Sequence, residues 1–105
     1  MARPIRKEDI PLQLDLARNL FENGELDEAK KVVDAVLLAG PAGDDEVETY
    51  YLRAEILFDQ GKFRQALLAY DAAATAAPGD AHVLAGKGEA LFNLWQFDKA
   101  EKAFE

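Results

Sequence analysis

The apolar positions of this chain follow a helical spacing, and the same block of them occurs three times. The blocks start at Phe21, Phe58 and Phe92 and read FENGELDEA, FDQGKFRQA and FNLWQFDKA. Their starts are 37 and 34 residues apart, and a period near 34 residues is typical of stacked helix-turn-helix units. The pattern therefore predicts an all-α fold built from repeated helix pairs.

Each block marks a turn between two helices. The turn position lies three residues after the first Phe and holds Gly24, Gly61 and, as a departure, Trp95. Apolar or small residues stand at fixed distances on both sides of it: Ala17, Ala54 and Gly88; Leu20, Leu57 and Leu91; Leu26, Phe63 and Phe97; Ala29, Ala66 and Ala100; Val33, Tyr70 and Phe104. We expect the small residues before the turn to let two helices approach closely. Pro41 and Pro78 end the second helix of the first two units, since proline cannot continue a helix.

Local signals predict where the helices begin. Pro11 suits a first helical turn, Asp45 with Glu48 resembles a capping box, and Asp80 is placed to cap the third unit. We expect a polar N-terminal tail over residues 1–9 and one domain over residues 10–105, divided into units at about 10–43, 47–80 and 81–105.

These recurring positions resemble the tetratricopeptide repeat, which combines a small residue, a glycine turn, an aromatic residue, an alanine, a larger apolar residue and a proline in this order. The resemblance covers residues 10–105 and implies a right-handed superhelix of stacked antiparallel helix pairs with about three units, the last one truncated. It also implies a protein-binding scaffold. Arg53 and Lys87 stand where the family usually has an apolar residue, and we expect their stems to be packed while their charges face water.

One face of the first helices predicts a binding groove. Residues ten, six and three before each turn share a helix face, which in this family resembles the wall of the concave groove. The three sets are Leu14, Arg18, Phe21; Tyr51, Glu55, Phe58; and Ala85, Glu89, Phe92, with Glu22, Asp59 and Asn93 along the edge. Aromatic anchors beside acids suit a peptide with apolar and basic side chains. The alternative is that the three phenylalanines only pack between neighbouring first helices.

The charge of the chain supports a basic partner and argues against a nucleic acid. Lys and Arg number 12 against 20 Asp and Glu, a net charge of −8. Arg3, Arg6 and Lys7 are all in the first seven residues, so the remainder is more acidic still and would repel phosphate groups. The alternative interpretation is a solvated acidic surface that keeps the protein in solution.

The chain offers little chemistry for catalysis. It has no Cys and no Ser, and His82 is its one histidine, so common acyl-transfer nucleophiles and a zinc ligand set are missing. We expect no catalytic site, no cofactor and no metal. No apolar run approaches the roughly 18 residues of a membrane span, and the N-terminus lacks the apolar stretch of a secretory signal. We therefore expect a cytoplasmic protein, or a periplasmic or other location if the chain is excised from a longer one.

The third unit ends soon after the start of its second helix. No following helix covers Phe104, so we expect an open apolar edge that includes Trp95, Phe97 and Phe104. Either the chain is a piece of a longer array, or two copies cover each other's ends as a homo-oligomer. Two alternative functions follow, a self-associating scaffold and a regulatory domain of a larger enzyme or secretion component.

Overall fold

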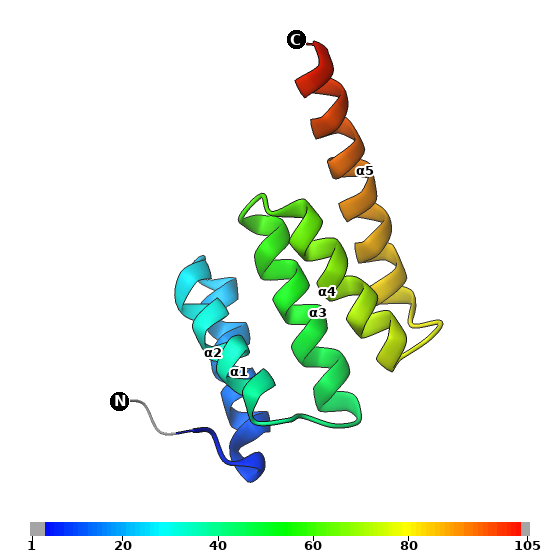
Figure 1. Ribbon diagram of the computed structural model, residues 1–105. Helices are drawn as coiled ribbons and strands as arrows, with labels where there is room; N and C mark the ends of the chain where they lie inside the picture. Colours follow the sequence, from blue (N-terminus) through cyan, green and yellow to red (C-terminus); the bar gives the residue numbers. More distant parts are fainter. Residues whose placement is uncertain (1–3, 104–105) are drawn as a thin grey trace.

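The computed structural model describes residues 4–103. Every regular element in this range is helical: η1 (Lys7–Asp9), α1 (Ile10–Glu22), α2 (Leu26–Leu38), α3 (Asp44–Asp59), α4 (Phe63–Ala76) and α5 (Ala81–Ala103). Each helix packs against the next, with α1 beside α2 and α3 beside α4 as antiparallel pairs (Figure 1). The structure thus confirms the predicted all-α fold of stacked helix pairs.

Glycine makes the turns inside the first two units. Gly24 and Gly61 have φ angles of 81° and 78°, in the left-handed region that residues with a Cβ rarely adopt. The amide after each glycine donates back across the helix end, from Glu25 to the Leu20 carbonyl and from Lys62 to the Leu57 carbonyl, at 2.9 Å in both cases. This bond closes a Schellman motif, so the two turns are equivalent in structure as well as in sequence.

The turn predicted at Trp95 is wrong, because the chain continues through this residue as one helix. α5 runs for 23 residues from Ala81 to Ala103. None of the non-glycine residues described has a positive φ, and a tryptophan would adopt that conformation only at a steric cost. The helix therefore continues through Trp95, whereas the equivalent glycines, Gly24 and Gly61, form turns. Figure 1 shows the last turns of α5 extending beyond the α3–α4 pair.

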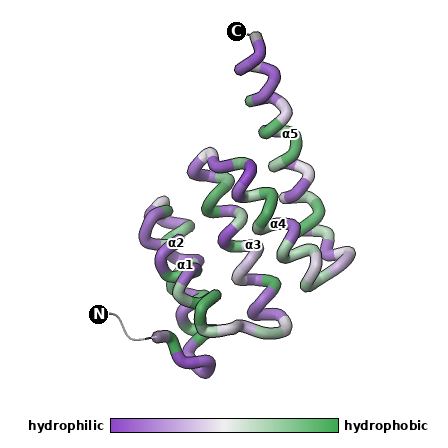
Figure 2. Tube along the Cα trace, in the orientation of Figure 1, coloured by the Kyte–Doolittle hydropathy of each residue, from purple (hydrophilic) through white to green (hydrophobic). Residues whose placement is uncertain are grey.

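Small residues bring the helices together, although not at every predicted position. Ala17 and Ala54 are fully buried, as expected. Gly88 instead faces open space, and the close approach in α5 is at Gly86, where an added Cβ would collide with the ring of Tyr70. Figure 2 shows that apolar positions also continue along the middle of α5.

The predicted helix starts hold at two of three places. Pro11 lies in the first turn of α1, and the Val83 amide donates to the Asp80 carboxylate at 3.1 Å, so Asp80 caps α5. The capping box at Asp45 is wrong, because the N-cap of α3 is Gly43, two residues earlier, and it provides no side-chain cap. Gly43 has a φ of 61°, and its conformation sets the start of α3.

A repeated ion pair joins successive units. Arg53 of α3 donates to the Asp34 carboxylate of α2 at 3.0 Å, and Lys87 of α5 lies 2.9 Å from the Asp71 carboxylate of α4. The two pairs occupy equivalent positions of the repeat. The basic residues at these usually apolar positions therefore hold a carboxylate of the preceding unit, so their charges are paired and do not face only water.

No helix in the described part of the chain is long and apolar enough to cross a membrane.

Candidate functional site

Two hollows lie along α3, on the side formed by the first helices of the units. One lies between α1 and α3, and its lining residues are Arg18, Phe21, Glu22, Glu48, Tyr51, Leu52 and Glu55. The other lies between α3 and the start of α5, and its lining residues are Asp44, Val47, Glu48, Tyr51, Ala77, Asp80, His82 and Val83. Because Glu48 and Tyr51 line both, the two hollows are neighbours, and we call them together the α3 groove.

The α3 groove is acidic. Its lining carries the carboxylates of Asp44, Glu22, Glu48, Glu55 and Asp80 against a single guanidinium, that of Arg18. Arg18 donates to Asp15 at 2.8 Å within α1 and also forms an ion pair with Glu48 across the groove. Its charge is therefore compensated within the chain, and the groove keeps an excess of negative charge.

The negative charge is concentrated around Glu55. Burial, with Asp59 and Glu89 nearby, raises the pKa of the Glu55 carboxyl above its ordinary value. Within residues 4–103, no ion pair involves Glu55, Asp59 or Glu89. Burial, Glu55, Asp80 and Glu89 also raise the pKa of the Tyr51 hydroxyl, since a second negative charge is unfavourable there. A cation placed in this region would relieve the repulsion.

The aromatic residues predicted to line the groove differ in their surroundings. Phe21 and Phe58 are partly buried and pack against the core, and the ring of Phe58 lies edge-on to Phe63 at 5.2 Å. Both rings therefore pack within the molecule, Phe58 against Phe63 of α4, although Phe21 also lines the groove. Tyr51 meets Tyr70 at 6.0 Å, also edge-on, and Phe92 is 58% exposed.

Not every predicted groove residue lies in the groove. Leu14 is 1% exposed and packs with Ile10 and Val36, so it is not accessible to a partner. Asn93 lies farther along α5 and donates its side-chain amide to the Glu89 carbonyl. Glu48 also lines the groove and was not predicted there, although it shares a helix face with Tyr51, which lies three residues, about one turn, after it.

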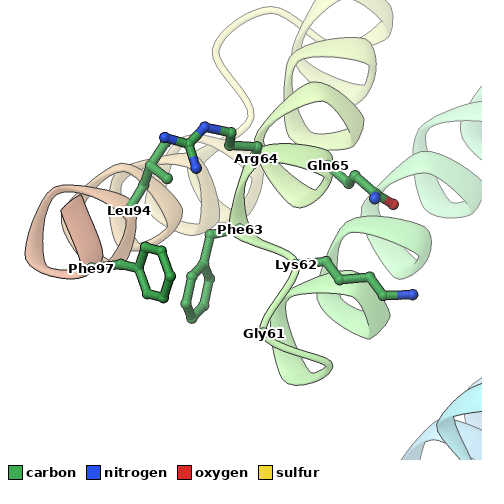
Figure 3. A pocket seen from close by; sticks show the side chains of 7 residues that line it. All are labelled: Gly61, Lys62, Phe63, Arg64, Gln65, Leu94 and Phe97. Atoms are coloured by element: carbon green, nitrogen blue, oxygen red, sulfur yellow. The ribbon is translucent and has the colours of Figure 1, made fainter. Parts of the chain in front are cut away.

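The predicted apolar edge is divided between two places. Phe97 points with Phe63 into a hollow between the start of α4 and α5, beside Leu94 (Figure 3). Asp98 follows it and accepts a hydrogen bond from Arg64 of α4 at 3.0 Å. Trp95 lies on another face of α5 and is 55% exposed. Phe104 lies outside the described residues.

No three His, Asp or Glu side chains between residues 4 and 103 gather into a metal site.

Helix pairs stacked in register, with a recessed surface along the first helices, define a helical repeat protein of the solenoid class. The model of the tetratricopeptide repeat family matches residues 14–81 and again residues 51–105. The chain therefore belongs to the tetratricopeptide repeat family, whose members are generally protein-interaction modules and typically not catalytic. Neither a curated protein nor a solved structure matches it significantly.

Proposed function

We propose that this chain is a protein-interaction module that binds a basic and apolar segment of a partner protein in the α3 groove. The observation that carries the proposal is the acidic lining of the groove, in which Glu55 lies in the same hollow as Tyr51 and has no ion-pair partner among the described residues, with Asp59 and Glu89 nearby. Phe92 and Asn93 lie farther along α5, outside the two hollows, and in this proposal they contact the same partner.

The physical argument rests on what such a surface prefers. A Lys or Arg side chain near Glu55 would replace repulsion between acids with attraction and would speed association at low salt. Tyr51 offers a ring for apolar contacts and a hydroxyl for hydrogen bonding. Arg18 is already paired with Glu48, so an acidic segment would find no uncompensated cation in the groove lining.

The groove acts by binding alone in this proposal. Its lining offers carboxylates, a tyrosine and the exposed His82, without a nucleophile held next to a base. Nucleophilic catalysis would need such a pair within hydrogen-bonding reach.

Site-directed photo-crosslinking in the source cell tests the location of the partner. A photoreactive residue replaces Glu22, an exposed residue of the groove, and in a matched control it replaces Leu68, an exposed residue of α4 outside the groove. We expect a partner to cross-link at position 22 and not at position 68. Adding Glu55→Lys and Glu89→Lys should abolish that cross-link while circular dichroism shows an unchanged fold. Cross-linking at position 68 alone, or a cross-link at position 22 that survives charge reversal, would contradict the proposal.

A further inference from the structure

α5 leaves one of its apolar faces uncovered. Leu84, Gly88, Leu91 and Trp95 are spaced by four, three and four residues and so share a helix face, which we call the α5 face. Leu84, Leu91 and Trp95 are 49%, 47% and 55% exposed, and Gly88 has open space where its Cβ would be. This face is separate from the side that packs on α4, where Val83 and Ala90 are buried.

The preceding unit shows what such a face normally contacts. Tyr50, Ala54 and Leu57 of α3 occupy the positions equivalent to Leu84, Gly88 and Leu91. Ala54 and Leu57 are fully buried, and they pack in one cluster with Ala66, Ala69 and Tyr70 of α4. The face is thus built to receive an antiparallel helix. Within the described residues, α5 has no such helix on this side, because the chain does not turn at Trp95.

We propose that a second copy of this chain supplies the missing helix, so that two α5 helices pair antiparallel through their α5 faces. α5 is about 34 Å long at 1.5 Å per residue, enough for several turns of contact. With the two-fold axis beside Leu91, the Trp95 ring of each copy lies against Gly88 of the other. The contact is isologous, since each copy gives and receives the same groups.

Shape and charge favour a second copy in this orientation. The largest side chain of the face, Trp95, then faces the residue that has none, Gly88, where nothing lies within 4 Å of an added Cβ. Lys99, which lies over the Trp95 ring at 4.9 Å, and Lys102 belong to the last turns of α5. The antiparallel register brings these cations toward Asp80 at the start of the other α5, whereas a parallel pair would place Lys beside Lys. The proposal is independent of the α3 groove.

The single tryptophan makes the contact measurable. Trp95 is the one tryptophan of the chain, so its fluorescence reports on the α5 face alone. Between low micromolar and several hundred micromolar protein, we expect the mass from sedimentation equilibrium to double while the Trp95 emission shifts to shorter wavelength. Leu91→Glu should keep the protein monomeric and the emission unshifted. Leu68→Glu, at a 69% exposed position of α4, should leave the dimer intact.

Cross-linking fixes the orientation. The chain has no Cys, so a single Leu91→Cys can form a disulfide only between copies, and an antiparallel pair brings the two residues together at the axis. We expect a covalent dimer from Leu91→Cys and none from Leu68→Cys.

Three results would overturn the proposal. A monomer at every concentration with an unshifted emission would leave the face to another protein. A monomer whose emission is already shifted would mean that residues after Trp95 fold back over the face. A dimer that persists in Leu91→Glu would use a different surface.

Discussion

Glycines two residues apart in α5 have opposite surroundings. At Gly86 the Tyr70 ring occupies the space that a Cβ would need, and Tyr70 is 4% exposed and cannot swing into solvent. At Gly88 nothing lies within 4 Å of an added Cβ. The same residue type therefore permits a close helix contact at one position and leaves an empty notch at the other.

A single added methyl should distinguish these two roles. Alanine stabilises a helix interior by about 1 kcal/mol relative to glycine, so Gly88→Ala should raise the free energy of unfolding by about that amount. Overpacking costs roughly 1–3 kcal/mol, so Gly86→Ala should lower the free energy of unfolding despite the same gain in propensity. Urea denaturation of dilute protein measures both. Equal stabilisation by the two changes would show that Tyr70 does not hold α5 at Gly86.

The repulsion around Glu55 should appear in the pH dependence of stability. Burial and the neighbouring acids Asp59 and Glu89 raise the pKa of Glu55 above 4.5 in the folded protein. The folded state then holds this proton more tightly than the unfolded state, so stability declines as the pH rises through the folded pKa.

Glu55→Gln removes this titration. The variant should be more stable than the original protein at neutral pH, by on the order of 0.5 kcal/mol because the site is partly solvated. The difference should disappear below about pH 4.5, the ordinary pKa of the group. Thermal unfolding of the two proteins across this range checks it, and a Gln variant that is less stable at neutral pH would contradict the charge account of the groove.

At the scale of the helix, the third unit differs from the first two at the turn residue, and we infer that this residue decides whether a unit forms a hairpin. α1 and α3 end at glycines with positive φ, whereas the equivalent Trp95 lies inside α5. The three units also share the apolar residue and the alanine that follow the turn position. Local backbone freedom therefore outweighs the repeat pattern in the third unit.

Restoring the glycine should restore the hairpin. With Trp95→Gly we expect α5 to divide near residue 95 and its end to fold back along the α5 face. Spin labels at Ala81→Cys and Lys102→Cys would lie about 32 Å apart along a continuous helix and much closer in a hairpin. Labelled protein is diluted with unlabelled protein so that only distances within one copy are measured.

Trp95→Ala is the matched control for that experiment. It also removes the indole but favours helix, so its label distance should stay long. If both variants kept the long distance, the turn would need more than a glycine.

At the scale of the molecule, the repeat period predicted the fold because many positions of the sequence follow the same period. The α3 groove was predicted in part, since Arg18 and Phe21 on α1, and Tyr51 and Glu55 on α3, share helix faces. The prediction that Leu14 lies in the groove was wrong because the start of α1 packs inward on Val36. This packing depends on how α1 lies on α2 and not on the spacing of residues along α1. The continuous α5 could not be read from the repeat, because the competing signal was one residue.

The α3 groove and the α5 face differ in chemistry, so they suit different kinds of contact. The α3 groove has more acids than cations in its lining, beside a tyrosine, whereas the α5 face is apolar with cations at its far end. A pair of copies joined through α5 would present two α3 grooves, so a partner with repeated basic segments would bind more tightly than its single segments do.

Peptide display on the original protein and on the Glu55→Lys, Glu89→Lys variant tests whether the α3 groove binds basic and apolar segments, because it measures the specificity of the groove without a known partner. We expect the original protein to select segments with apolar residues next to Lys or Arg. The variant should no longer bind these segments and should select acidic ones. Selected peptides should shift the amide resonances of Tyr51 and Glu55. The same peptides selected by both proteins, or resonance shifts confined to α2 and α4, would contradict an acidic recognition groove along α3.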